Sequence, residues 1–423
     1  MTALHLLVVL IVLYLVFSIR NRFKYDLLLK KCKNKLSSAD LKATDRWTIA
    51  FLHGKRKEKD PLADETVASI MQKHQTGQVN HLFEAFLDDS DTIPDEAPDA
   101  LKDYFRQTAV LPGWADQDML DLGQQVYLRY GFFISLLLSY KSLPECYACA
   151  KGAEVLHRTA RLNEKHGSLD SYSRRIAETA QFIFYAMSPG GLGPMGRGLH
   201  ATQKVRLIHG VIRYYLPKAG WETEDWDEPV NHEDMAGTLM AFSALILEGM
   251  ELIGLKLTPT EKEAYVHCWC VIGHIMGFGD EMIPKNAADA SALGHAILDD
   301  QITESPQGKS LMSALLTFCN YNARPFLGEK TNIRMMRMMM GPDLSDLLGV
   351  PPIDGTEKLK KKLRFISRLV QRLDNTYVLS LFVQWSHRIL LQLTISRMTK
   401  SNVINFYLPA SMKKDWSPYK TKA

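Results

Sequence analysis

The sequence predicts an all-α protein, in which a domain of many helices is preceded by one N-terminal transmembrane helix. Apolar residues recur at helical spacing through most of the 423 residues, and proline and glycine residues separate the helical segments. No run of alternating apolar and polar residues indicates a sheet. The composition, 46% hydrophobic and 23% charged, is that of an ordinary globular protein with a large core.

The first helix is expected in the apolar N-terminal segment. Residues 3–19 are apolar except for His5 and Ser18, and as a helix they would extend across roughly 25 Å, enough to span a thin bilayer. A cleaved signal peptide is the alternative, but no basic residue precedes the run and no small-x-small cleavage pattern follows it. We therefore predict a membrane anchor at residues 1–20, which contacts the membrane through residues 3–19.

Basic residues indicate the orientation of this anchor. None precedes the apolar run, and the following residues come directly after it: Arg20, Arg22, Lys24, Lys30, Lys31, Lys33 and Lys35. Because such charges concentrate on the cytosolic side of a span, the rest of the chain is expected to face the cytosol. The prediction is a single-pass protein of the endoplasmic reticulum or another intracellular membrane.

Three parts are expected beyond the anchor: a helical N-terminal segment and linker at 21–110, a main domain at 111–325 and a C-terminal helical segment at 326–423. In the main domain, apolar periodicity predicts helices over 116–138, 144–163, 171–187, 200–216, 232–254, 259–278, 286–300 and 309–323. The acidic run Asp88 to Asp91 has the composition of a Mg²⁺ site. Nearby Pro94 and Pro98 argue against the helix that such a site needs, so we interpret it as a solvated loop.

The C-terminal segment holds a methionine-rich stretch, Arg334 to Gly341, followed by a basic run, Lys358 to Arg364. Methionines usually fill irregular gaps in a core; a substrate-facing or membrane-facing surface is the alternative. The stretch Tyr377 to Ile395 is apolar but is interrupted by polar and charged side chains. A packed or interfacial amphipathic helix is therefore favoured over a second span.

Composition argues against several classes of function. The net charge of +4, without a sustained basic stripe, gives no case for a nucleic-acid partner. Six cysteines in so long a chain do not form a disulfide framework. Cys146 and Cys149 have metal-type spacing, but a zinc site needs four ligands and no second pair follows. The chain has no H-E-x-x-H motif, which weakens the case for a metal-dependent hydrolase.

Polar side chains gather on the helix predicted at 171–187. Arg175 and Thr179 are four residues apart and hence on one face, with Glu178 adjacent to it. An exposed polar stripe is one interpretation. The apolar run Phe182 to Met187 that follows favours the other, in which this helix enters the core and carries a basic, an acidic and a hydroxyl group inward.

The next helix carries a second polar set. Arg206, His209 and Arg213 have i, i+3 and i+7 spacing and share one face of an apolar helix. A lone histidine on a helix is more often a core or surface residue than a ligand. Two flanking arginines favour ligation here, because guanidinium groups bind carboxylates such as those of haem and imidazole is a standard ligand of haem iron. Other histidines could support or replace this ligand: His200, His232, His267 and His274.

These residues resemble the family of rubber oxygenase (latex clearing protein) and the ER-bound oxygenase MpaB. The matching elements are R-x-x-x-T at Arg175 and Thr179, R-L-x-H-x-x-x-R at Arg206 to Arg213, and the block from Pro229 to Pro284. The resemblance covers roughly residues 110 to 300. It implies that the main domain, residues 111–325, is the helical, haem-binding catalytic domain of this family.

Known members hold a b-type haem and use O₂ to cleave carbon–carbon double bonds in isoprenoid chains. By resemblance, His209 ligates the iron, while Arg175 and Thr179 fall on the distal side, where they would steer O₂ and the alkene. Glu178 is the local candidate for a base. It stands where rubber-cleaving members tend to carry a lysine, so the substrate and the mode of cleavage are open.

The prediction is thus a membrane-anchored, haem b-dependent oxygenase that uses O₂ as co-substrate and acts on a double bond of a lipophilic, isoprenoid-like small molecule. In it, Arg206 and Arg213 bind the cofactor together with His209. The alternative is a membrane-tethered lipid-binding or scaffold protein that has the same helical fold and no chemistry.

Overall fold

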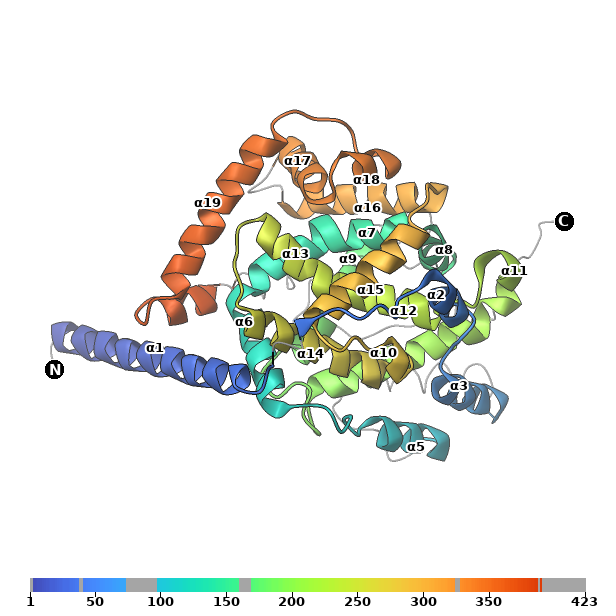
Figure 1. Cartoon of the computed structure of the whole chain (residues 1–423), viewed down its shortest axis with the longest axis horizontal. Helices are drawn as coiled ribbons and strands as arrows, with labels where there is room; N and C mark the ends of the chain where they lie inside the picture. Colours follow the sequence, from blue (N-terminus) through green and yellow to red (C-terminus); the bar gives the residue numbers. More distant parts are fainter. Residues whose placement is uncertain are drawn as a thin grey trace.

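The structure is a computed structural model that describes residues 3–37, 41–73, 97–159, 169–323, 328–386 and 389. Its helices are, in chain order, α1 (Ala3–Lys33), α2 (Ile49–Lys55), α3 (Pro61–Lys73), α5 (Asp99–Thr108), α6 (Gln117–Leu137), α7 (Leu143–Ala148), α8 (Ala150–Arg158), α9 (Leu169–Ala186), α10 (Arg197–Tyr215), α11 (Thr223–Trp226), α12 (His232–Phe242), α13 (Ala244–Leu252), α14 (Pro259–Met276), α15 (Ala287–Gln301), α16 (Pro306–Ala323), α17 (Glu329–Met340), α18 (Pro342–Leu347) and α19 (Thr356–Asp374) (Figure 1). A π-helical turn, η2 (Leu138–Ser142), joins α6 to α7. These residues contain no strand, only an isolated bridge between Cys149 and Ile302. The prediction of an all-α fold is confirmed.

Helices α6 and α14 pack along each other in the core. Gly123 on α6 permits this close approach, because a Cβ atom there would lie 2.3 Å from the carbonyl oxygen of Ala264 on α14. A capping box starts α14: the Thr258 hydroxyl accepts from the N–H of Glu261, and the Glu261 carboxylate accepts from the N–H of Thr258. Gly277, with φ of 83°, ends it. These signals explain why the helix predicted at 259–278 agrees with α14 to within two residues.

Helix α10 packs against α3, α9 and α14. A Cβ atom on Gly198 would lie 2.3 Å from the Cα atom of Ala186 on α9, and one on Gly210 would lie 3.1 Å from the carbonyl oxygen of Ala63 on α3. Both glycines therefore let neighbouring backbones approach α10 closely. The helix is held on several sides, so its side chains have fixed positions.

Two helices predicted as continuous are interrupted. The one at 144–163 is broken at Cys149, whose ψ of 97° is extended, because this residue forms the bridge with Ile302. The one at 232–254 divides into α12 and α13 at Ser243, whose hydroxyl donates to the Leu239 carbonyl over 2.8 Å. The apolar pattern runs through both breaks, so periodicity did not reveal them.

Helix α1 extends away from the rest of the molecule at its N-terminal end (Figure 1). Its C-terminal half is fixed, because Tyr25 and Cys32 are buried in a small core with Met119, Leu122 and Ala264. The side chains of residues 1–11 lie outside the described part, so the transmembrane span at 3–19 stays a prediction.

Among the described helices, one stretch is long and apolar enough to cross a membrane. It is His232–Leu252, which comprises α12 and α13 and is 67% buried within the protein, as expected of a core element. Two sequence predictions fall outside the described residues: the acidic run Asp88 to Asp91, and most of the apolar stretch beyond residue 386. The methionine-rich stretch forms α17, whose Met335, Met336, Met338 and Met339 are buried as core residues.

Candidate active site

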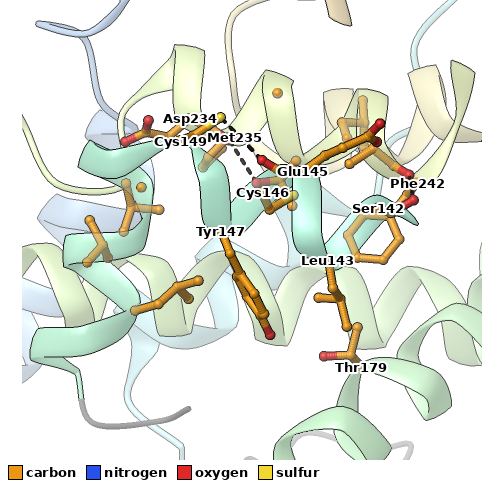
Figure 2. Close-up of a pocket in the computed structure, with 18 of the residues that line it drawn as sticks. Ser142, Leu143, Glu145, Cys146, Tyr147, Cys149, Thr179, Asp234, Met235 and Phe242 are labelled. Carbon is orange, nitrogen blue, oxygen red and sulfur yellow. Dashed lines mark hydrogen bonds between the residues drawn. The ribbon is translucent and has the colours of Figure 1, made fainter. Parts of the chain in front are cut away.

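A cavity of about 280 Å³ lies in the main helical core. Its wall is formed by η2 and α7 to α10 together with α12, α14 and α15, and most of the lining side chains are apolar. Leu143 and Tyr147 extend from α7 toward Thr179 on the facing helix α9 (Figure 2). A volume of this order is near the lower end of the range for small-molecule sites. The cavity is therefore the place to look for chemistry.

His209 lines this cavity from α10. Its neighbours Leu207, Ile208 and Val211 are buried in the core around it, so the imidazole is carried on a fixed helix. Of the histidines in the described part of the chain, His209 alone lines the cavity. This position suits an iron ligand, because a ring nitrogen must be able to reach a group bound in the cavity.

Arg175 and Thr179 line the same cavity from α9. The Thr179 hydroxyl donates to the Arg175 carbonyl over 3.1 Å, which holds it against its own helix. The Arg175 guanidinium lies 3.5 Å from the carboxylate of Glu178. The structure thus brings together His209, Arg175 and Thr179, three of the residues singled out in the sequence.

Glu178 is buried but does not line the cavity. Its carboxylate reaches Arg175 instead, and so it orients the guanidinium rather than facing bound molecules. The role of Glu178 as a base near bound oxygen stays a prediction; the contact that the structure shows is with Arg175.

The two arginines that flank His209 have protein partners. Arg206 binds the Asp60 carboxylate through Nε and Nη2, over 2.6 and 2.8 Å, and donates to the Ile275 carbonyl on α14. Arg213 binds Asp64 over 2.6 Å. Neither arginine lines the cavity. The contacts therefore do not support the predicted role of Arg206 and Arg213 in binding haem carboxylates; both tie α10 to α3 and its N-terminal boundary.

Glu145 is a cavity residue that the sequence reasoning missed. It is buried on α7, and one of its carboxylate oxygens accepts from Lys141 Nζ over 2.5 Å. Its other oxygen is buried and has no hydrogen-bond partner among the described residues. Burial raises the pKa of Glu145, and Lys141 opposes that rise. The available signal was a lysine and a glutamate four residues apart in an apolar stretch.

Asp234 reaches the cavity from α12 and belongs to a buried charge network. Arg56 Nη1 lies 3.0 Å from its carboxylate and also binds Glu233, while Arg56 Nε binds Asp227 over 2.6 Å. One guanidinium therefore serves three carboxylates. Burial raises the pKa of Glu233 to about 7, although Arg56 opposes that rise.

The other histidines considered in the sequence lie away from the cavity. Burial lowers the pKa of His267 to about 4, and its Nε2 accepts from the N–H of Asp116 over 3.0 Å. His274 Nδ1 is 2.7 Å from the Asp280 carboxylate. His200 and His232 do not line the cavity either.

His232, Glu58 and Glu281 form a cluster of metal-ligand type outside the cavity. Lys55 Nζ already bridges its two carboxylates, at 2.9 Å from Glu58 and 2.7 Å from Glu281. Burial lowers the pKa of His232. The lysine supplies the positive charge that this cluster needs, so it requires no metal.

The profile of the family described as "ER-bound oxygenase mpaB/B'/Rubber oxygenase, catalytic domain" matches residues 122–372. The chain belongs to this family. The match runs from α6 to α19 and includes every residue that lines the cavity. It extends beyond residue 325, so α17, α18 and nearly all of α19 are family elements.

Two known proteins are similar to this chain. Rubber oxygenase from Streptomyces sp. (strain K30) is 25% identical over 320 residues, which are 71% of this chain and 72% of the relative. The solved structure of latex clearing protein LCP in the closed state matches with a TM-score of 0.69, at 21% identity, over 84% of this chain and 95% of the other. This structural likeness shows a shared fold. Family membership makes the chain an oxygenase.

Proposed function

We propose that the protein is a membrane-anchored, haem b-dependent oxygenase that uses O₂ to cleave or oxygenate a carbon–carbon double bond of a hydrophobic, isoprenoid-like molecule. One observation carries the proposal: a single histidine, His209, lines an apolar cavity whose facing helix presents Arg175 and Thr179. The family description names an oxygenase, and the Streptomyces relative is named a rubber oxygenase.

The residues present fit a haem. The cavity offers an imidazole donor, mainly apolar walls and one guanidinium, that of Arg175, among the described lysine and arginine side chains. His209 would ligate the iron, and Arg175 is the residue placed to meet an anionic group. When bound, the haem supplies the activation of O₂. Fixed helices and a water-poor pocket are the contribution of the protein.

The chain's own polar groups suggest how the reaction is guided. Arg175, which Glu178 orients, places a fixed positive charge in the cavity. Thr179 adds a hydroxyl beside it. Glu145 is the better candidate for a base than Glu178, because Glu145 lines the cavity and Glu178 does not, and one of its carboxylate oxygens has no hydrogen-bond partner among the described residues and could accept a proton from carbon next to a double bond. Lys141 holds that carboxylate in place.

The membrane part of the proposal rests on residues 3–19. As a span, they would hold the catalytic domain on the cytosolic face of the endoplasmic reticulum or another intracellular membrane, where lipophilic substrate is concentrated. Protease treatment of sealed microsomes tests this orientation. A C-terminal tag should be digested without detergent, and a protected tag would contradict the proposal.

An absorption spectrum tests the cofactor. The purified full chain, supplied with haem, should show an intense Soret band, and His209→Ala should abolish or strongly shift it. The matched control is His295→Ala, because this histidine is exposed on α15 and outside the cavity. A missing band in the unaltered chain would favour the lipid-binding or scaffold alternative. An unchanged band in His209→Ala would refute the assigned ligand.

A further inference from the structure

Helix α19 carries two apolar stripes. One packs onto the core through Leu359, Leu363 and Val370, on the side where Ser367 and Asp374 are buried. The other comprises Phe365, Ile366, Leu369 and Leu373, which are all exposed, with Phe365 reaching 69%. A helix that packs on one side only needs one such stripe. The second stripe therefore faces something other than this fold.

The exposed stripe continues onto the segment that follows α19. In residues 376–386, Phe382 is 63% exposed and Trp385 is 62% exposed. Single exposed apolar residues are ordinary, but a contiguous group of large ones marks an interaction site. Tryptophan at the edge of such a group is typical of the boundary between water and lipid.

Hydrogen bonds place this segment directly beside α1. The Tyr14 and Ser18 hydroxyls donate to the Val378 carbonyl over 2.8 and 3.0 Å, and Asn21 donates to Gln384 over 3.1 Å. The contacts are with the C-terminal end of the predicted span at 3–19. Figure 1 shows α19 descending toward α1 at one edge of the molecule.

Helix α1 adds an exposed apolar side chain to this edge. Phe17, next to Ser18, is 58% exposed. We call the group Phe17, Phe365, Leu369, Phe382 and Trp385 the apolar edge. It combines three segments that are far apart in the sequence, and it lies at the level where the predicted span would leave the bilayer.

Charge identifies the partner of the apolar edge. Besides its apolar stripes, α19 carries seven basic side chains and two acidic ones: Lys358, Lys360, Lys361, Lys362, Arg364, Arg368 and Arg372 against Glu357 and Asp374. Asp374 is buried and neutralised by Arg129, so the exposed charge is mainly positive. Exposed apolar side chains flanked by lysine and arginine match the interface of an anionic lipid bilayer.

We propose that the apolar edge docks on an anionic bilayer surface, so that α19 and residues 376–386 lie in the headgroup region beside the anchor. The inference deepens the membrane attachment of the proposed function and rests on it. Such docking would hold the catalytic domain against the bilayer in one orientation, whereas an anchor alone would let the domain rotate relative to the membrane.

Spin labels on the full chain test the docking. Leu369→Cys and Phe382→Cys report on the apolar edge, and Ile49→Cys is the control. Ile49 is an exposed apolar residue of α2, and Figure 1 shows α2 on the other side of the molecule from α19. The labelled chain without added cysteine gives the background. After reconstitution with vesicles of phosphatidylcholine and phosphatidylserine, O₂ should relax the Leu369 and Phe382 labels more than a water-soluble nickel chelate does. The Ile49 label should show the reverse.

Flotation separates this inference from the anchor. Protein that floats with the vesicles while its Leu369 label remains as open to the chelate as the Ile49 label would overturn the docking and leave the anchor intact. Protection of Leu369 without vesicles would show a second copy on the apolar edge, and would also overturn it.

The charge requirement has its own variant. Lys361 and Lys362 are exposed, so K361Q/K362Q should fold normally. The docked fraction on phosphatidylserine vesicles should then shift toward the undocked form by about fivefold per side chain removed. An unchanged docked fraction would contradict the role assigned to the basic residues.

Discussion

Helix α10 uses its polar side chains in two different ways. His209 enters the cavity, whereas Arg206 and Arg213, one turn before and after it, extend to Asp60 and Asp64 at the start of α3. The three share one face by spacing, yet only the short side chain reaches the cavity. Spacing along a helix therefore predicts on which side of the helix a side chain lies. Its partner depends on the length of the side chain and on which carboxylates lie within reach.

The largest expected effect is on stability, and it comes from breaking the ion pair between Arg206 of α10 and Asp60 at the start of α3. Arg206→Met leaves Asp60 buried without its partner and should lower the free energy of unfolding by about 3–5 kcal/mol, as measured by urea titration. Asp60 is almost fully buried, so the double variant R206M/D60L should recover much of that loss. Haem content of the folded fraction should stay normal. Normal stability with lost haem would mean that Arg206 serves the cofactor after all.

Glu145→Gln tests the cavity side. Loss of a base should lower kcat by about 100-fold or more, while the Soret band of the folded fraction stays near that of the unaltered chain. Stability should also fall, because Lys141 loses its buried counter-charge. Burial raises the pKa of Glu145, and only the deprotonated form accepts a proton. Activity should therefore rise with pH through that raised pKa, and the rise should vanish in the variant. Glu248→Gln is the control, because Glu248 pairs with His295 outside the cavity; an equal loss there would contradict the assignment.

The ion-pair network of Arg56 with Glu233, Asp234 and Asp227 offers a third region for comparison with the Arg206–Asp60 pair. Because the folded pKa of Glu233 is about 7 and its ordinary value is 4.5, the folded state binds this proton more tightly than the unfolded state. Stability should thus fall as pH rises from about 5 to about 7, by roughly 1–3 kcal/mol. Glu233→Gln should remove this slope in thermal unfolding. A slope that persists would place the titrating group elsewhere.

The smallest effect is expected at Thr179. Thr179→Val removes the hydroxyl at nearly constant volume, and this hydroxyl donates to the Arg175 carbonyl of its own helix. Stability should change by less than about 1 kcal/mol. Turnover should fall about tenfold, which corresponds to one neutral hydrogen bond in the reaction. Thr179→Ser should retain activity, and an equal fall in both variants would point to packing rather than to the hydroxyl.

Helical periodicity was enough to predict the all-α fold and the positions of α6, α10 and α14. It also placed Arg175 and Thr179 on one helix face. Only the family resemblance predicted that His209 lies near them, and the structure places all three around one cavity. The break at Cys149 depends on a long-range contact with Ile302, and the break at Ser243 accompanies a side-chain bond to Leu239; apolar periodicity displays neither. Glu145 was missed because only packing reveals that one of its oxygens is buried without a partner.

The pairing of Arg206 and Arg213 could not be predicted for a related reason. Asp60 and Asp64 stand about 150 residues earlier, in a segment without periodic relation to α10. Such long-range ion pairs are chosen by how helices pack. The spacing predicted the helix face correctly and left the partner undetermined.

The π-helical turn at Leu138–Ser142 sets the angle at which one cavity wall is presented. A π turn holds an extra residue relative to an α-turn, and each residue of an α-helix rotates the chain by about 100°. Removing one residue from this turn would therefore rotate α7 relative to α6. Glu145 would leave the cavity, and it would also lose its position beside Lys141, which lies within the turn itself. The single inserted residue thus sets the rotation of α7 relative to α6, and so directs Glu145 to the cavity without a change in the helices on either side.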